Sequence, residues 1–279
     1  MFMTQFLGFR LIFMDALLVN LYVCAALCFV VWLASVLTGD HSMVDRIWSI
    51  IPIVYAWVFA GAANWADVRL NVMATLVTLW GARLTFNFAR KGGYAKGGED
   101  YRWPVLRAGM NNWQFAIFNI FFIVIFQNAI LLGIIAPAYT VLNNPGEFTY
   151  ADAALTFAFL FFLSLETVAD QEQWNFHQFK KAEASAGRTV TPGFLQDGLF
   201  KISRHPNFFS EQAQWWVFAG FAIAATGKVD WTILGAVVLT ALFIGSTRFT
   251  EQITASKYPE YREYQKRVSA LVPWWPRRG

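Results

Sequence analysis

The stretch SRHPNFFSEQAQWWVFAGFAIAA, residues 203–225, joins a group of polar side chains directly to a run of apolar ones. Its polar half contains an Arg-His pair, an Asn, a Glu and two Gln. Charged groups cost several kcal/mol each when they leave water unpaired, so a chain that carries them into an apolar segment usually has a use for them. The apolar half predicts a membrane-spanning helix, and the polar half predicts the entrance to a functional site.

The composition of the whole chain predicts an integral membrane protein. Of 279 residues, 57% are hydrophobic and 14% are charged, and the mean hydropathy is +0.40. Soluble domains have about 25% charged residues. Cys24 and Cys28 lie four apart in the first apolar block, with no His or acid at ligand spacing, so we expect core residues and neither a disulfide nor a metal site.

We predict an all-α integral membrane protein with seven transmembrane helices, because seven stretches are long and apolar enough to cross a bilayer. The predicted spans lie at about 11–38, 47–65, 70–89, 113–136, 150–170, 208–226 and 230–248. The first stretch is too long for a signal peptide and has no clear cleavage site. No internal repeat or low-complexity linker divides the chain, so we expect one domain over residues 1–279.

The basic residues predict the orientation of these spans. With the N-terminus outside, the cytoplasmic connections and the tail hold 18 Lys and Arg residues, the outer side holds three, and Arg83 lies within a span. The positive-inside rule then places the C-terminus in the cytoplasm, in a bacterial inner membrane or an endoplasmic-reticulum-type membrane.

A first polar cluster lies in ETVADQEQWNFHQFKK, residues 166–181. Glu166 and Asp170 are four residues apart, so they share one helical face, and His177 and Lys181 continue that face beyond the span. Polar groups in a span usually face an interior site rather than lipid. The alternative is a helix that emerges into water with solvated acids and bases.

A second cluster lies in the stretch quoted first. Asn207, Glu211 and Gln214 form one stripe along the start of the sixth predicted span. Arg204 and His205 precede that helix, where the helix dipole favours anions, so the stretch predicts a phosphate or pyrophosphate site. The alternative is an Arg-His pair that anchors the span to lipid headgroups.

Two further regions carry polar and aromatic groups. Residues 89–107 form a basic, glycine-rich loop that ends in EDYRW, where Tyr101 and Arg102 are typical of a nucleotide-holding loop. Arg248 is the last residue of the seventh predicted span. In the tail that follows, Tyr261 and Tyr264 could stack on a nucleotide. A membrane-surface helix is the alternative for the tail.

Several of these segments together resemble the steroid 5-alpha-reductase family. GLFKISRHPNFFSEQAQWW, residues 198–216, is similar to the family's C-terminal signature, usually written around R-H-P-N-Y-x-x-E. Further similar segments are VDRIWSIIP at 44–52, WGARLTF and EDYRW within 80–103, ETVADQEQWNF at 166–176 and YREYQKRVSALVPW at 261–274. The resemblance covers most of the chain.

The resemblance implies an enzyme that uses NADPH to reduce the 4,5 double bond of a 3-oxo-Δ4-steroid or a similar enone lipid. It places the substrate mainly among residues 1–110 and the cofactor mainly in residues 150–279. The expected partners are the substrate and the lipid bilayer, and we expect neither nucleic acid nor an obligatory protein partner. Its motifs and the clusters above give the expected cofactor contacts, which are Arg83, Tyr101, Arg102, Asp170, His177, Lys181, Arg204, His205, Asn207, Glu211, Arg248, Tyr261 and Tyr264.

The reduction also needs a donor for the 3-oxo group of the substrate. The animal enzymes of the family use a Glu and a Tyr, but here Asp45 stands in place of a clear Glu, and Trp80 stands where the Tyr is expected. We predict Asp45 and Tyr55 as the catalytic pair, and Trp48 and Trp80 as substrate contacts. The alternative for Asp45 is an ion pair with its neighbour or a helix cap.

Three other functions stay open at this point. Isoprenylcysteine carboxyl methyltransferases and phospholipid methyltransferases have a similar C-terminal stretch but use S-adenosylmethionine. A sterol reductase that acts on a C14 or C7 double bond is a closer neighbour. A non-catalytic receptor or channel would leave the polar stripes beside the basic loop without a role.

Overall fold

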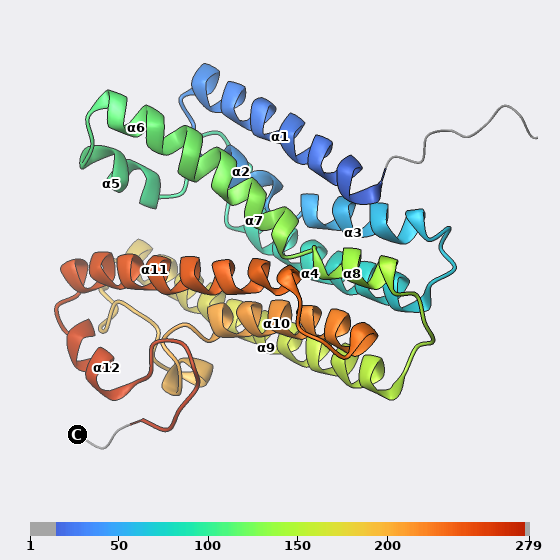
Figure 1. The fold of residues 1–279 in the computed structure, drawn as a ribbon. Coiled ribbons are helices and arrows are strands. Elements are labelled where there is room, and N and C mark those ends of the chain that lie inside the picture. Colours follow the sequence, from blue (N-terminus) through green and yellow to red (C-terminus); the bar gives the residue numbers. More distant parts are fainter. Residues whose placement is uncertain (1–14, 277–279) are drawn as a thin grey trace, which may run out of the picture.

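A computed structural model describes residues 15–276, which form a helical bundle that contains no strand in this range (Figure 1). The first half contains α1 (Ala16–Thr38), α2 (Met43–Ile47), α3 (Ile51–Ala62), α4 (Val68–Arg90), α5 (Arg102–Ala108), α6 (Asn112–Phe118), the π-helix η1 (Asn119–Phe126), α7 (Gln127–Gly133) and α8 (Pro137–Asn143). The second half contains α9 (Tyr150–Ser185), the 3-10 helix η2 (Gly198–Lys201), α10 (Pro206–Thr226), the 3-10 helix η3 (Trp231–Ile233), α11 (Leu234–Lys257) and α12 (Tyr261–Arg267).

The long helices pack in two groups (Figure 1). Helix α10 packs along α9, and α11 lies beside them, while α3 packs along α4 and α8 joins the two groups. The shared core contains large side chains from both groups, such as Tyr55 and Phe59 of α3, Trp80 of α4 and Phe218 of α10, all fully buried.

Local sequence signals fix where several helices begin and end. Asp67 accepts a hydrogen bond from Leu70 N at 2.9 Å and so caps α4, and Thr149 and Asp152 form a capping box at the start of α9. Gly227 ends α10 with φ of 70°, a left-handed conformation that glycine adopts without strain. These caps explain why the long helices keep sharp ends next to short loops.

Within residues 15–276, four helical segments are long and apolar enough to cross a membrane, so the expected membrane character is supported. They are Ala16–Thr38, Asn112–Asn143, Tyr150–Ser185 and Trp231–Lys257. The predicted spans at 70–89 and 208–226 correspond to α4 and α10, which are long enough but too polar to meet the same criterion, and 47–65 corresponds to α3, which has only 12 residues. The start of the first predicted span, 11–14, lies outside the described residues.

Two elements differ from the sequence expectation in shape. The predicted helix at 113–136 contains a π-helix, η1. Phe118, the last residue of α6, stacks on Phe122 of η1 at a centroid separation of 4.8 Å, and Phe122 stacks on Phe126 at 5.4 Å. The predicted span at 150–170 continues as one helix to Ser185, because no proline or glycine interrupts it before Gly187. This extension carries polar side chains beyond the apolar segment.

Candidate functional site

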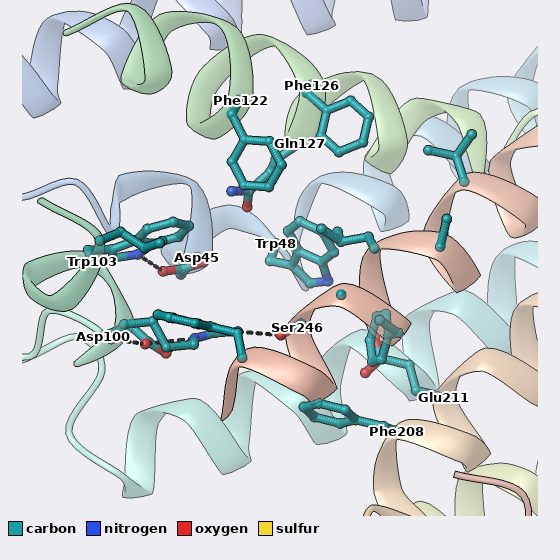
Figure 2. Close-up of a pocket in the computed structure, with 18 of the residues that line it drawn as sticks. Asp45, Trp48, Asp100, Trp103, Phe122, Phe126, Gln127, Phe208, Glu211 and Ser246 are labelled. Atoms are coloured by element: carbon teal, nitrogen blue, oxygen red, sulfur yellow. Dashed lines mark hydrogen bonds and ion pairs between the residues drawn. The ribbon is translucent and has the colours of Figure 1, made fainter. Parts of the chain in front are cut away.

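A mainly apolar cavity of about 780 Å³ lies between the α2–α3 turn, α4, α5, η1, α10 and α11 (Figure 2). Ligand-binding pockets of proteins commonly have about 300–1,000 Å³ and a mostly apolar lining with a few polar groups. Aromatic side chains line much of this one, among them Trp48, Phe122 and Phe208. The polar side chains that reach its wall are Asp45, Ser49, Asp100, Arg102, Gln127, Glu211 and Ser246.

Asp45 places a carboxyl group in the cavity wall. The short helix α2 presents it, and Trp103 Nε1 donates a hydrogen bond to its Oδ2 at 3.0 Å (Figure 2). Burial raises the pKa of Asp45 from 3.8 to about 6, although the Trp103 hydrogen bond opposes this shift. Arg46 pairs with Asp40 at 2.6 Å instead of with Asp45. The carboxyl group is therefore oriented by one hydrogen bond and opens into the cavity.

The EDYRW loop forms a second polar part of the wall. Asp100 accepts hydrogen bonds from Arg102 N and Nε at 2.9 and 2.8 Å, and Arg102 Nη1 donates to Ser246 Oγ at 3.0 Å. The loop is held in turn by Ser42 Oγ, which accepts from Asp100 N at 2.9 Å. Arg102 thus lies in the cavity wall with its charge balanced by Asp100, and it joins α5 to α11.

A buried group of charges lies between α4, α9 and α10. Arg83 donates to Glu166 at 2.5 Å and to Asp170 at 2.6 Å, and Asn87 Nδ2 donates to Asp170 at 2.8 Å. Lys91 adds a longer contact of 3.9 Å to Asp170. The predicted inward face of residues 166–170 is present, because both carboxyl groups point into the protein and are paired there.

The polar stripe of α10 faces this charge group and the cavity. Asn207 Nδ2 donates to Asp170 at 3.3 Å, and Gln214 Nε2 donates to Glu166 at 2.7 Å. Glu211, between them on the helix, is 7% exposed and lines the cavity. Its Oε1 is buried and has no hydrogen-bond partner among the described residues. The stripe therefore connects the charge group to the cavity through a carboxyl oxygen that can still accept a hydrogen bond.

The Arg-His pair before α10 takes part in a separate network. Arg204 binds both carboxylate oxygens of Glu251, at 2.6 and 2.9 Å, and His205 Nε2 lies 3.0 Å from the same carboxylate. Gln265 Nε2 donates to Glu251 at 2.8 Å. The structure thus pairs these predicted anion-binding residues with an acid of α11 and with the C-terminal segment.

The remaining predicted site residues fall into three sets. Tyr55 and Trp80 are fully buried in the core away from the cavity, with Trp80 edge-on to Trp215 at 4.8 Å. Tyr261 and Tyr264 are buried in a small apolar cluster around Phe194. Exposed side chains on the surface are Tyr101, His177, Lys181 and Arg248.

Gln127 is a cavity residue that the sequence reasoning missed. It is 4% exposed, lines the cavity and stands at the start of α7 (Figure 2). A signal for it exists in the sequence, because it is a polar residue inside the apolar run NIFFIVIFQNAILLG, and polar residues within spans tend to be functional.

Comparison with known proteins identifies the family to which the chain is similar, and the activity of that family is not known. A family model described as "Protein of unknown function (DUF1295)" matches residues 31–268. The chain is 41% identical over 261 residues to the uncharacterized protein C594.04c of Schizosaccharomyces pombe, covering 88% of this chain and 76% of the other. No solved structure matches the chain significantly.

Proposed function

The chain belongs to the DUF1295 family of proteins of unknown function, and we propose that it is an NADPH-dependent membrane reductase of conjugated enone lipids. The expected substrate class is a 3-oxo-Δ4-steroid or a lipid with a similar enone, whose carbon–carbon double bond takes up two hydrogens. The observation that carries this proposal is the mainly apolar cavity of about 780 Å³ with the Asp45 carboxyl group in its wall.

The shape and chemistry of the cavity suit such a substrate. Its aromatic and aliphatic walls favour an apolar body over a charged or strongly hydrated one. An enone adds a single polar atom, the carbonyl oxygen, which needs a hydrogen-bond donor when it is buried. Asp45 supplies that donor in its protonated form.

Asp45 is suited to hold a proton near neutral pH. Because burial raises its pKa to about 6, Asp45 holds a proton near neutral pH more readily than an exposed acid does, and it can be protonated again from water after each transfer. As the hydride adds to the β carbon of the enone, charge develops on the carbonyl oxygen, and the proton of Asp45 neutralises it. The resulting enol then takes up a proton from water at its α carbon and returns the oxygen-bound proton to Asp45, which completes the addition of two hydrogens. Trp103 keeps the carboxyl group in place for this transfer.

The polar stripe of α10 fits the proposed cofactor. NADPH, when bound, supplies the hydride for the reduction. The unpartnered Oε1 of Glu211 is a buried acceptor that suits a carboxamide N–H, and Asn207 lies one helical turn away. We assign the exposed cationic residues Arg248 and Lys181 to the phosphate groups of the cofactor.

We also propose the finer topology that the sequence indicates. Helices α3, α4 and α10 complete the set of seven spans. Helices α4 and α10 can do so although they are polar, because much of their polarity faces the Arg83 charge group rather than lipid. With the N-terminus outside and the C-terminus in the cytoplasm, the ends of α9 and α11 that carry Lys181 and Arg248 face the cytoplasm, where NADPH is available.

The experiment that tests the function uses the purified, detergent-solubilised full-length protein. NADPH, NADH or S-adenosylmethionine is added, thermal stabilisation is recorded, and progesterone is followed by mass spectrometry. For the wild type we expect stabilisation by NADPH and a product that is heavier than progesterone by two hydrogens. We expect the Asp45→Asn variant to form no product, although NADPH still stabilises the variant. Stabilisation by S-adenosylmethionine alone would contradict the proposal and favour a methyltransferase.

A further inference from the structure

Gln127 carries an unpaired amide into an otherwise apolar part of the cavity. The residue is 4% exposed, and its side chain forms no hydrogen bond with any residue of the described range 15–276. In Figure 2 the carboxamide points away from η1 and into the cavity. The amide atoms open into the cavity instead of being enclosed by protein, so they are available to a ligand.

The local backbone explains why this amide faces the cavity. In an α-helix, with 3.6 residues per turn, side chains five positions apart point in clearly different directions. The π-helix η1 has i→i+5 hydrogen bonds and a wider turn, so residues four and five positions apart stay on one face. Phe122, Phe126 and Gln127 therefore all line the cavity, with the two rings stacked at 5.4 Å.

A neighbouring amide is held by its own helix. Asn128, the next residue, is fully buried outside the cavity lining, and its Nδ2 donates to Val124 O at 2.8 Å, while its Oδ1 is enclosed without a partner among the described residues. The bond of Nδ2 anchors this side chain locally. Gln127 makes no such bond, and its amide is directed at the ligand space.

We propose that Gln127 is a specificity-determining residue that donates a hydrogen bond to a second oxygen of the ligand. This inference rests on the proposed function, because it assumes that the first oxygen, the enone carbonyl, is held by Asp45. The preferred substrate class is then an apolar, elongated enone with a further carbonyl or hydroxyl oxygen, rather than an enone with a plain hydrocarbon end. A site with a buried donor favours a ligand that pairs with it over an analogue that lacks the partner.

The test compares two steroids that differ only in the second oxygen. Progesterone has carbonyl oxygens at C3 and C20, and pregn-4-en-3-one has the C3 oxygen alone. Their dissociation constants are measured by equilibrium dialysis with the full-length protein in detergent and without NADPH, for the wild type and for Gln127→Leu. We expect the preference for progesterone to fall about three- to tenfold in the variant, as for the loss of one neutral hydrogen bond.

A second measurement separates this role from a structural one. Because Leu removes a buried amide that has no protein partner, Gln127→Leu should unfold at the same temperature as the wild type or at a higher one. Gln178→Leu, the same change at an exposed position of α9, serves as the control and should leave the steroid preference unchanged. A clear loss of thermal stability in Gln127→Leu would assign the amide to the fold and overturn the inference.

The remaining outcomes are also decisive. An unchanged preference in a folded Gln127→Leu variant would overturn the inference, and so would the absence of any binding of either steroid to the wild type. Failure of the reductase proposal gives a different result, in which NADPH yields no reduced product. Loss of the preference in the dialysis experiment would still support Gln127 as the contact in that case, because dialysis measures binding without turnover.

Discussion

Arg204 holds Glu251 through two hydrogen bonds, from Nε at 2.6 Å and from Nη2 at 2.9 Å, and so joins the start of α10 to the last turns of α11. Both side chains are only 9% exposed. Arg204 also donates to the backbone carbonyls of Gln265 and Val268, which fixes the C-terminal segment against the same point. The arginine of the sequence motif thus has a structural role in addition to any role in binding.

Loss of Arg204 should destabilise the protein even without a cofactor. Arg204→Ala leaves the Glu251 carboxylate buried without its main partner, and breaking a buried pair in this way costs about 3–5 kcal/mol. Thermal unfolding of the purified variant in detergent, with no nucleotide present, measures the loss. The double variant Arg204→Met with Glu251→Leu removes both charges and should recover part of the stability; an equal loss in both variants would contradict the ion-pair explanation.

Asn207→Ala and Glu211→Ala should abolish the stabilisation by NADPH while the protein still inserts and folds. Both residues lie on the stripe of α10, and Glu211 has the unpartnered carboxyl oxygen that we assign to the cofactor. The shift of the unfolding temperature on addition of NADPH measures the effect. Gln212→Ala, whose amide bonds only within its own helix, is the matched control. Normal NADPH stabilisation of both variants would show that the stripe is structural.

The sequence predicted the α10 stripe well, because helical periodicity alone places Asn207, Glu211 and Gln214 on one face. It also predicted the inward face of Glu166 and Asp170, since an acid within an apolar segment needs a buried partner. The partner itself, Arg83, lies more than 80 residues earlier in the chain, and spacing within one helix gives no information on such a pair. Its role in binding was expected only from the family resemblance.

Residues whose environment depends on tertiary packing were harder to predict. Tyr55 follows Asp45 by ten residues along the chain, but it is fully buried in the core and does not line the cavity. Gln127 was missed because its direction depends on the π-helix before it, which hydrophobic periodicity does not reveal. Arg204 was predicted from the helix dipole, whereas its acid partner Glu251 comes from another helix.

Two glycines of α11 should respond in opposite ways to the same substitution. A Cβ atom at Gly235 would meet the backbone of Gly133 at the close contact between α11 and α7, while a Cβ atom at Gly245 would have no atom within 4 Å. Gly235→Ala should therefore lower the thermal stability by forcing the two helices apart, by about 1–3 kcal/mol. Gly245→Ala should raise it by up to about 1 kcal/mol, since Ala favours the helix. Similar losses in both variants would argue against the close helix contact.

Asp45 should make the stability of the protein depend on pH in a defined window. Because its pKa is raised from 3.8 to about 6 by burial, the folded state keeps a proton between these values that the unfolded state loses. Its contribution is therefore fully present below about pH 4 and is lost as pH rises to about 6, by at most about 3 kcal/mol. Unfolding temperatures of wild type and Asp45→Asn, measured from pH 4 to 7, should differ in slope over this window. Asp197→Asn, at an exposed acid, should keep the wild-type slope, and a wild-type slope in Asp45→Asn would contradict the assignment.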